Sequence, residues 1–516
     1  MDKKNLELKE IYAEAVNNQQ KGNFETAENL YKKILKVNPN HINTQNNLGA
    51  LFMQMGNNKK AMERLQKILE IEPNNVNANE NLGIIFNELA EYLKAIECHK
   101  KVIKIKSSHA NAYNNLAINY RQIGESGLAK SHFYKAIEIN PNHANAYNNL
   151  GILLGTLNEH EKALSAFKKS LQLQPNFFSA QVNIANTYIK QLNIEKAISV
   201  SYKNLSIHHK ISKIANQQIP LFRLKHDVQQ AGYLKSKNYK IDGLDEFNEI
   251  GKEILNRKEN QEDINFSKKI LLKEKETKSL LPFYKSEYIY FPPNLPGGSL
   301  NPHKDWGEIE MEYFSSPKQI IYIDNFLSKE AIEEIREFCL LSKIWVRQYD
   351  NKYLGAFSDK GFISPMHLQI ATELRKKLPK LFGKYNLEKF WGFKYDTTLG
   401  GGIGVHADFA YLNLNFWITP DEYNNDKDRG GLKVYDVPAP EDWSFTKYNQ
   451  DAKEIYKFLN EKNAKCETIP HKFNRAVLFN SAYFHETDKI DFKDGYESRR
   501  INITYLFGTR QIKKIN

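Results

Sequence analysis

The sequence has few cysteines, no long apolar run and no sign of a secretory leader. Cys98, Cys339 and Cys466 are an odd, scattered set that provides neither a disulfide framework nor a thiolate metal site. No segment approaches the roughly 18 consecutive apolar residues of a membrane span. The amino-terminal stretch MDKKNLELKE also lacks the apolar core of a signal peptide. We therefore expect a cytoplasmic protein with no membrane partner.

The net charge is basic, but the basic residues are not concentrated in one place. A formal charge of +12 at pH 7 raises the question of nucleic-acid binding. The lysines are spread among many acids, however, and no Arg-rich or aromatic-interleaved block occurs. The charge therefore indicates a solvated surface, and no nucleic-acid partner is expected. With 41% hydrophobic residues in 516, the chain is long and apolar enough for two or three packed domains.

The amino-terminal part of the chain repeats every 34 residues. Alanine recurs at this step at Ala27, Ala61, Ala95, Ala129, Ala163 and Ala197. Other small residues recur in phase at Ala15, Gly49, Gly83, Ala117, Gly151 and Ala185. Small residues let two helices approach closely, and a pair of helices that cannot bury its apolar face alone stacks on the next pair. About six repeats are therefore expected to form an α-solenoid with a concave surface over residues 1–206.

These units resemble the tetratricopeptide repeat. The fifth unit carries the pattern most completely, as Tyr147-x2-Leu150-Gly151-x2-Leu154, then Ala163-x3-Phe167 and Pro175. Asparagine holds one place in five successive units: Asn47, Asn81, Asn115, Asn149 and Asn183. An amide offers both a donor and an acceptor, which suits an extended peptide backbone. The resemblance implies a protein or peptide partner on the concave face, and we predict that this asparagine ladder binds it. The alternative is that asparagine is simply frequent in this chain.

The middle of the chain, residues 207–316, is less informative. Helical patterning over 211–280 predicts a helical cap and linker, and the Pro- and Gly-rich stretch over 290–306 predicts irregular structure. That stretch contains His303-Lys304-Asp305, one of two His-x-Asp triplets. It has no flanking strand pattern, so we expect a structural or surface role for it.

Short strand-like segments dominate the carboxy-terminal part, residues 317–516. QIIYID reads as a strand, and helices are expected from near Ser328 and from Ser364-Pro365. Beyond Phe390 come FWGFKYDTT, AYLNLNFWIT, GGLKVYDV, CETIPHK, RAVLFNS and RRINITYLFG. This many short antiparallel strands predicts a double-stranded β-helix, or jelly roll, with flanking helices. The whole chain is then a multidomain α + β protein.

The second His-x-Asp triplet, in GGGIGVHADF, lies between two of these strands. His406 and Asp408 can share one side of an extended segment, and His485 is the candidate third ligand from a strand distant in sequence. Two imidazoles and a carboxylate make the facial triad of non-haem iron sites. In RRINITYLFG, Arg500, Asn502 and Thr504 share one strand face. An arginine inside a dry barrel needs an anion.

These segments resemble the 2-oxoglutarate/Fe(II) oxygenases of the prolyl-hydroxylase-like group, over residues 320–510. The matching pieces are YDTTLGGGIGVHAD, GGLKVYDV, FNRAVLFNSAYFHETD and RRINITYLFG. The resemblance implies that His406, Asp408 and His485 bind Fe(II), that Arg500 and Tyr395 bind the cosubstrate 2-oxoglutarate, and that O2 is consumed. Thr504 is added to the cosubstrate site because it shares a face with Arg500. The retained Asp408 implies hydroxylation rather than halogenation.

Two departures from the family pattern leave questions open. The insertion DFKDGY lengthens the gap between His485 and Arg500, so Arg499 stays possible as the cosubstrate arginine. A helical insert is expected over 441–464, and it weakens any transfer of substrate identity. We predict a dioxygenase that hydroxylates a C–H bond of a protein or peptide recruited by the repeats. The alternatives are a non-catalytic adaptor with a degenerate barrel, and an oxygenase acting on a small molecule or glycan.

Overall fold

The computed structural model describes residues 3–211, 218–259, 269–349, 351, 353–396 and 401–510. The chain divides into two compact units, residues 1–177 and 178–511, and each is described by itself. None of the helices in the described residues combines the length and the apolar character that a membrane span needs.

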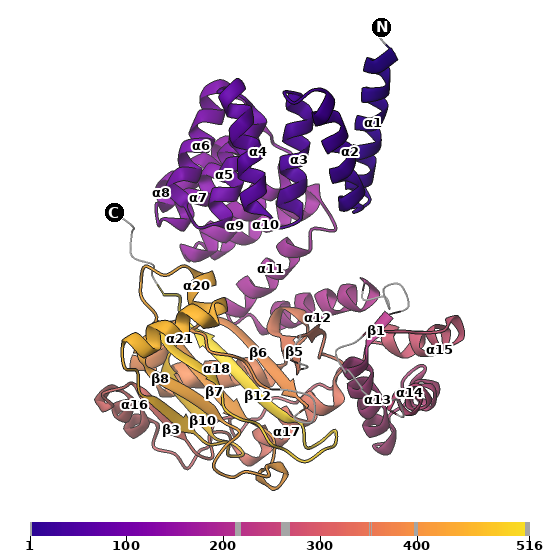
Figure 1. Ribbon diagram of the computed structural model, residues 1–516. Helices are drawn as coiled ribbons and strands as arrows, with labels where there is room; N and C mark the ends of the chain where they lie inside the picture. The colour runs from indigo at the N-terminus through magenta and orange to yellow at the C-terminus, as the bar shows by residue number, and fades with distance from the viewer. Residues whose placement is uncertain are drawn as a thin grey trace. The chain divides into compact units, whose positions relative to one another are not determined.

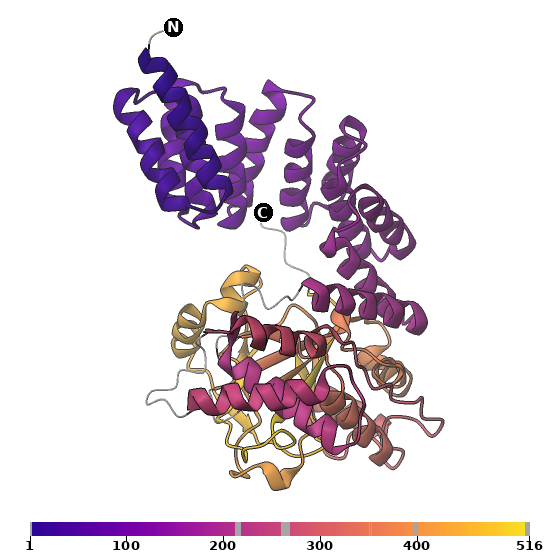
Figure 2. The ribbon, with the colours of Figure 1, turned by 90° about the vertical axis from the view of Figure 1, so that its right-hand side faces the viewer.

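The first unit is built from antiparallel helix pairs that stack side by side (Figure 2). Its helices over the described residues are α1 (Lys3–Gln20), α2 (Phe24–Val37), α3 (Ile42–Gln54), α4 (Asn58–Ile71), α5 (Val76–Glu88), α6 (Tyr92–Ile105), α7 (Ala110–Gln122), α8 (Ser126–Ile139), α9 (Ala144–Thr156) and α10 (His160–Leu173). The phased small residues lie where two helices meet. A Cβ added to Gly151 would come within 2.5 Å of the Phe167 ring on the partner helix. The 34-residue period therefore reflects helix packing, as predicted.

The helices of the sixth repeat belong to the second unit. They are α11 (Phe178–Lys190) and α12 (Ile194–Ile211). The Tyr202 hydroxyl on α12 donates to the Ile363 carbonyl at 2.7 Å, and the Asn204 amide donates to the Asp359 carbonyl at 3.0 Å. The middle of the chain continues as α13 (Leu221–Ser236), α14 (Leu244–Glu259) and α15 (Glu274–Lys285), with a small antiparallel pair β1 (Gln218–Pro220) and β2 (Lys269–Leu271). The helical patterning there is thus observed, and the strand pair was not predicted.

Two antiparallel sheets form the centre of the second unit (Figure 1). The described residues give a seven-stranded sheet in the order β3-β10-β7-β12-β6-β5-β4 and a three-stranded sheet in the order β11-β8-β9. The strands are β3 (Ile320–Ile323), β4 (Arg347–Gln348), β5 (Tyr353–Phe357), β6 (Leu387–Tyr395), β7 (Leu412–Trp417), β8 (Leu432–Pro438), β9 (Cys466–Ile469), β10 (Ala476–Asn480), β11 (Tyr483–Thr487) and β12 (Arg500–Phe507).

An apolar core joins the two sheets at the β10–β7 side. Trp417, Val477 and Phe479 of the larger sheet pack with Val434 and Ile469 of the smaller one. Trp417, Val477 and Phe479 lie on one face because strand side chains alternate. This apolar packing holds the smaller sheet against one part of the larger sheet. Along the same face, toward β12, β6 and β5, the side chains become polar and aromatic.

Helices cover the other face of the larger sheet. They are α16 (Trp306–Ser315), α17 (Lys329–Leu341), α18 (Pro365–Lys377) and α19 (Pro379–Phe382). Ser328 and Ser364 cap α17 and α18 as predicted, each hydroxyl accepting from the amide three residues on. Asp305 caps α16, accepting from the Gly307 and Glu308 amides at 3.0 Å. In the His303-Lys304-Asp305 triplet, Asp305 therefore has a structural role as a helix cap.

The insert over 441–464 forms two helices, α20 (Phe445–Gln450) and α21 (Ala452–Glu461). Its buried side chains Trp443, Ile455 and Leu459 pack in one cluster with Val405 and Phe484. These two partners flank His406 and His485 in the sequence, so the insert braces the segments that carry both histidines. Two 3-10 turns, η2 (Ser358–Lys360) and η3 (Asp421–Tyr423), complete the described elements.

Candidate metal centre

His406 and His485 meet through their backbones. The His406 amide donates to the His485 carbonyl at 3.0 Å, and the His485 amide donates to the His406 carbonyl at 2.8 Å. This isolated antiparallel bridge brings the two ring centroids to 4.3 Å. It fixes two imidazoles side by side although one lies in a loop and the other on β11.

Each of these imidazoles has one ring nitrogen held by the backbone. His406 Nδ1 lies 2.8 Å from the Gly404 carbonyl, and His485 Nδ1 lies 3.0 Å from the Tyr483 carbonyl. A carbonyl oxygen only accepts, so both Nδ1 atoms carry a proton, and Nε2 is the nitrogen that each ring, when neutral, offers to a metal. This arrangement fixes the ring orientation and tautomer of histidine ligands in metal sites.

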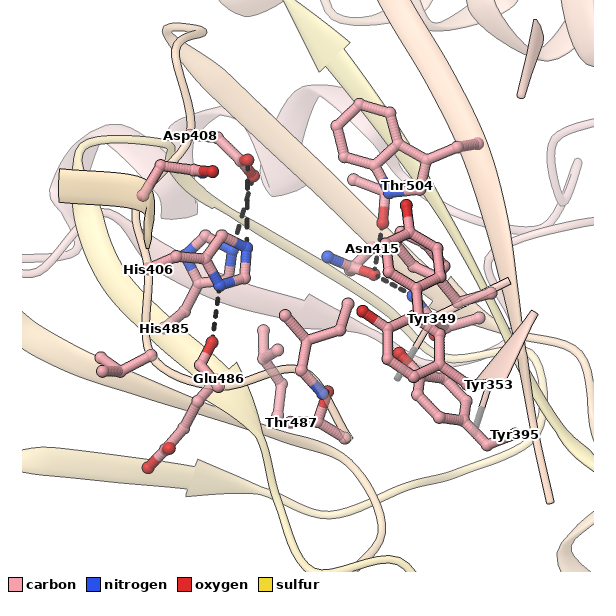
Figure 3. Close-up of a pocket in the computed structure, with 18 of the residues that line it drawn as sticks. Tyr349, Tyr353, Tyr395, His406, Asp408, Asn415, His485, Glu486, Thr487 and Thr504 are labelled. Carbon is pink, nitrogen blue, oxygen red and sulfur yellow. Dashed lines mark hydrogen bonds and ion pairs between the residues drawn. The ribbon is translucent and has the colours of Figure 1, made fainter. Parts of the chain in front are cut away.

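Asp408 completes a group of three potential ligands. Its Oδ1 lies 4.0 Å from His406 Nε2, and its Oδ2 lies 3.4 Å from His485 Nε2. One ligand atom from each of the three residues falls within 4.8 Å of the others. Figure 3 shows the three side chains converging at one side of a cavity. Two imidazole nitrogens and a carboxylate that face one another are ligands suited to a divalent cation.

The electrostatics agree with that donor set. Burial, helped by the neighbouring His485, lowers the pKa of His406 to about 4. Burial acts to raise the pKa of Asp408, but its contacts with His485, His406 and Asn413 outweigh burial and hold the pKa below its usual value. Near neutral pH the site therefore presents a neutral His406 imidazole beside an ionised carboxylate, which are the protonation states that bind metal.

The loop before His406 approaches its neighbours closely. A Cβ added to Gly402 would come within 2.2 Å of the Thr487 side chain, so only glycine fits there. The Ala407 amide donates to the Tyr448 carbonyl at 2.9 Å, and the Asn449 amide donates to the Ala407 carbonyl at 2.8 Å. The glycine-rich approach and the insert together hold His406 and Asp408 in place. Residues 397–400 of this loop lie outside the described residues.

A chain of buried amides runs from Asp408 to Arg500. Asn413 Nδ2 donates to Asp408 Oδ2 at 2.6 Å, and Asn415 Nδ2 donates to Asn413 Oδ1 at 3.1 Å. Asn502 Nδ2 donates to Asn415 Oδ1 at 3.1 Å, and Arg500 Nη1 donates to Asn502 Oδ1 at 3.1 Å. Every amide donates toward the carboxylate and accepts from the arginine side. We call Asn413, Asn415 and Asn502 the amide relay.

Arg500 is buried in the cavity without a carboxylate partner. Its Nε donates to the Gly430 carbonyl at 2.6 Å, and its Nη2 donates to the Gly431 carbonyl at 3.0 Å. In the described part of the chain it forms no ion pair, and burial lowers its pKa to about 10. Its guanidinium lies 5.0 Å from the centre of the Tyr395 ring. A guanidinium that has lost this much hydration would be stabilised by an anionic ligand.

Arg499 has a different environment. Its Nη2 donates to Asp396 Oδ2 at 2.8 Å and to Gln229 Oε1 at 2.7 Å. Adjacent residues on a strand point to opposite faces, so Arg499 lies on the helix-covered side and does not line the cavity. Of the two arginines that the sequence left open, the structure places Arg500 with the candidate metal ligands.

The cavity beside these residues has a volume of about 590 Å³. It is lined by all six predicted metal and cosubstrate residues: His406, Asp408, His485, Arg500, Tyr395 and Thr504. The Thr504 hydroxyl donates to Asn415 Oδ1 at 2.9 Å, so Thr504 supports the amide relay. Figure 3 shows Tyr349, Tyr353 and Tyr395 on the side opposite the histidines.

Sequence reasoning placed Asn502 beside Arg500 but missed Asn413, Asn415 and most of the aromatic side. Asn413 and Asn415 alternate within an otherwise apolar strand, and that alternation was the available signal. Tyr353 and Tyr349 come from β5 and the segment after β4, which are short elements with no clear periodicity.

The asparagine ladder lies on the first helix of each pair. Asn47, Asn81, Asn115 and Asn149 are on α3, α5, α7 and α9, and Asn183 is on α11 in the second unit; all five are half-buried. Some of these amides are engaged within the solenoid. Asn47 Nδ2 donates to the Tyr12 hydroxyl at 2.8 Å, and Asn149 Nδ2 donates to Asn114 Oδ1 at 3.0 Å. A peptide would compete with, or add to, these bonds.

Comparisons with known proteins find matches to the amino-terminal repeats. Tetratricopeptide-repeat family models match residues 19–79 and 108–176. A solved structure of MamA is 29% identical, covers 31% of this chain and 94% of its own, and gives a TM-score of 0.28. A thermophilic TPR protein of Thermus thermophilus is 17% identical, covering 35% and 98%, with a TM-score of 0.32.

YrrB, described as a TPR protein with an unusual peptide-binding site, is 21% identical, covers 34% of this chain and 91% of its own, and gives a TM-score of 0.28. A search of curated proteins gives no match. The predicted amino-terminal tetratricopeptide repeats are therefore confirmed, and they support a role in protein interaction.

Proposed function

We propose that the chain is a 2-oxoglutarate- and Fe(II)-dependent dioxygenase that hydroxylates a C–H bond of a polypeptide. The observation that carries the proposal is the shared cavity of His406, Asp408, His485 and Arg500. A dicarboxylate such as 2-oxoglutarate has two ends. The metal held by the triad would bind one end, and the buried arginine, which has no ion pair in the described residues, would bind the other.

The fold interpretation belongs to the same proposal. A seven-stranded and a three-stranded antiparallel sheet that pack face to face, with the candidate site between them, are consistent with a double-stranded β-helix. In the smaller sheet, β11 carries His485, and Gly430 and Gly431 directly precede β8. These residues lie opposite the larger sheet. In a jelly roll this interior position is where a ligand site is enclosed by both sheets.

The residues present fit the proposed iron. The Nε2 atoms of His406 and His485 and the ionised Asp408 would hold it as two nitrogen ligands and one oxygen ligand. Iron with 2-oxoglutarate and O2 supplies the oxidising chemistry, in which a substrate C–H becomes C–OH while 2-oxoglutarate becomes succinate and CO2. The amide relay orients Asp408, because a carboxylate that accepts a hydrogen bond from Asn413 is held in one rotamer.

Arg500 would hold the far carboxylate of 2-oxoglutarate. Its guanidinium donates to the Gly430 and Gly431 carbonyls and to the Asn502 amide oxygen, and among the described residues no carboxylate forms an ion pair with it. A bidentate pair with a carboxylate would provide that neutralisation. Tyr395 lies beside this guanidinium and is fully buried, so it closes the same end of the cavity against water.

The repeats support a polypeptide substrate. Solenoids of this kind present extended concave surfaces, and tethering such a surface to a catalytic unit raises the effective concentration of a weakly bound side chain. A cytoplasmic location belongs to the proposal, since the cysteine usage suits a reducing compartment.

The comparisons alone favour a second candidate, a non-catalytic adaptor that uses its repeats to hold proteins, because they reach only the repeats. The two candidates differ in the product. We would capture partners of the full chain with the Asp408→Ala variant and incubate each with wild-type protein, Fe(II) and 2-oxoglutarate. A mass gain of one oxygen atom that requires Asp408 supports the dioxygenase. Captured partners that stay unmodified under these conditions support the adaptor.

A further inference from the structure

A group of basic side chains borders the cavity at the side away from Arg500. Arg347 and Lys389 line the cavity, and both lie against Phe357, at 5.6 Å and 5.7 Å from the ring centre. Lys360, at the end of η2, lies 5.2 Å from the centre of the Phe178 ring; burial lowers its pKa, and the charges of Arg347 and Lys389 act in the same direction. We call Arg347, Lys360 and Lys389 the cationic rim.

The rim is set by sheet register. Lys389, Trp391, Phe393 and Tyr395 share the cavity face of β6 because strand side chains alternate. Glu388 lies on the opposite face and pairs with Lys190 at 2.5 Å, so it does not neutralise Lys389. On the next strand, Phe357 lies opposite Trp391 in register.

No carboxylate lies at ion-pair distance from the rim in the part of the chain that the structure describes, which does not include Asp350. None of the three rim cations forms an ion pair there. Asp359, the buried residue before Lys360, acts to raise the pKa of Lys360, but burial and the neighbouring cations outweigh it. Of the two described acids that line the cavity, Asp408 belongs to the metal triad, and Glu486 accepts from the Tyr435 and Tyr456 hydroxyls at 2.8 Å and 2.6 Å.

Within the rim, Lys389 lies toward the metal end of the cavity, whereas Arg347 is in register with Gly355, Phe393 and Asn502. Lys389 is in register with Leu506, and Leu506 is in register with Asn413, the residue that contacts Asp408. The backbones of Lys389 and Asn413 are therefore two strand spacings apart, roughly 10 Å. Arg500 is three rows further along β12, opposite Tyr395. A ligand held by Lys389 would thus approach the candidate iron from a side different from that of a ligand held by Arg500.

Aromatic side chains lie between the rim and the metal end. Tyr353, Phe357, Phe393 and Tyr395 form one buried cluster, and Tyr349 and Trp391 pack against it. Gly355 makes room for them, since an added Cβ would come within 3.0 Å of both the Phe357 and Tyr349 rings. This surface suits an apolar side chain, and the rim suits an anionic group next to it.

We infer that the substrate of this site is an acidic polypeptide segment, in which aspartate or glutamate residues flank the apolar residue that enters the cavity. The rim cations would hold those carboxylates, and the aromatic cluster would hold the apolar side chain. The inference rests on the proposed function for the identity of the reaction. Its recognition chemistry depends only on the rim.

The test is peptide binding by the full-length protein, measured by fluorescence anisotropy. The probe is a fluorescein-labelled peptide with glutamates on both sides of a central leucine, and its control has glutamine in their place. The triple variant Arg347→Gln, Lys360→Gln and Lys389→Gln removes the rim. The matched variant Lys252→Gln, Lys329→Gln and Lys376→Gln removes the same charge from exposed positions that do not line the cavity.

We expect each rim cation to contribute about two- to fivefold in affinity for the glutamate peptide, and the three together at least about tenfold. The preference should weaken as salt is raised. The matched variant should bind as the wild type does. Equal binding of the glutamate and glutamine peptides, or equal loss in both triple variants, overturns the inference.

Two further binding measurements test whether the anionic group binds at a different place or comes from a different kind of partner. Binding lost in Arg500→Lys but retained in the rim variant would place the anion at Arg500 and overturn the inference. A phosphoserine peptide that binds more than about tenfold tighter than the glutamate peptide would assign the rim to a phosphorylated partner instead. Because binding needs neither iron nor turnover, a negative result here is separate from failure of the proposed function.

Discussion

Asp408 and Arg500 lie on different segments, yet an unbroken series of side-chain hydrogen bonds through three buried asparagines joins them. The direction of each bond is fixed at the ends, since a carboxylate only accepts and a guanidinium only donates. The candidate metal end and the candidate cosubstrate end of the cavity are therefore structurally coupled.

Cutting this relay next to Asp408 should weaken metal binding. Asn413→Leu keeps the approximate volume and removes the donor to Asp408 Oδ2. We expect the affinity for Fe(II) or Co(II), measured anaerobically by competition with a chelator, to fall by about 10- to 100-fold. Asn502→Leu cuts the relay at the arginine end and should weaken 2-oxoglutarate binding more than metal binding. Unchanged metal affinity in Asn413→Leu would show that the relay does not position Asp408.

The two neighbouring arginines should give opposite phenotypes. Arg500→Lys keeps the charge but loses the planar fork, so 2-oxoglutarate affinity should fall by about 2–5 kcal/mol, while metal affinity is largely kept. Arg499→Lys weakens the pair with Asp396 and should lower the melting temperature without changing 2-oxoglutarate affinity. Titration of the absorption band of the anaerobic Fe(II)–2-oxoglutarate complex measures the affinities. If Arg499→Lys alone loses that affinity, the assignment of Arg500 is wrong.

This pair of arginines also shows what the sequence could and could not predict. Period-two alternation usually shows which side chains face the core, but every residue of β12 is buried because helices cover one face and the cavity lies on the other. A strand buried on both faces has no polar side to orient it, so Arg499 and Arg500 look alike in sequence. Only the partners of each side chain separate them.

Other features were predictable because they depend on local chemistry. The capping roles of Ser328 and Ser364, and the phase of Gly83 and Gly151 in the repeats, follow from short-range sterics and hydrogen bonding. The backbone bridge between His406 and His485 depends on sheet pairing between distant segments, so the sequence offered His485 only as a candidate third ligand. Arg347 lies on a two-residue edge strand, which is too short to show any pattern.

The repeats should be sensitive to mild acid. His143 Nδ1 accepts from the Ala146 amide and caps α9, so it must be unprotonated, and burial lowers its pKa. The folded state then binds fewer protons than the unfolded state. This stability is fully present above the unfolded pKa of about 6.5 and is lost as pH falls below it.

Asn75 caps α5 at the equivalent position without titrating, accepting from the Ala78 amide at 3.0 Å. His143→Asn should therefore keep the cap and reduce the loss of melting temperature between pH 7 and pH 5, by the equivalent of about 1 kcal/mol at most. Circular dichroism at several pH values measures it. Identical pH dependence in the two proteins would mean that this cap does not contribute.

The asparagine ladder should affect substrate delivery if it binds polypeptide. Asn81→Ala, Asn115→Ala and Asn149→Ala together leave the apolar packing positions unchanged. With a polypeptide partner identified by capture, we expect KM to rise while succinate formation without substrate is retained. Asn43→Ala, at an exposed position on α3, serves as the control. If KM is unchanged in the triple variant, the ladder is not the substrate groove.

The most direct measurement is formation of succinate from 2-oxoglutarate by the purified full chain with Fe(II) in air. We predict turnover by the wild type, which His406→Ala and Asp408→Ala each reduce to background because they remove candidate iron ligands. His303→Ala, in the other His-x-Asp triplet, changes an exposed histidine and should keep wild-type turnover. Equal succinate formation by the wild type, His406→Ala and Asp408→Ala would contradict the assignment of this site.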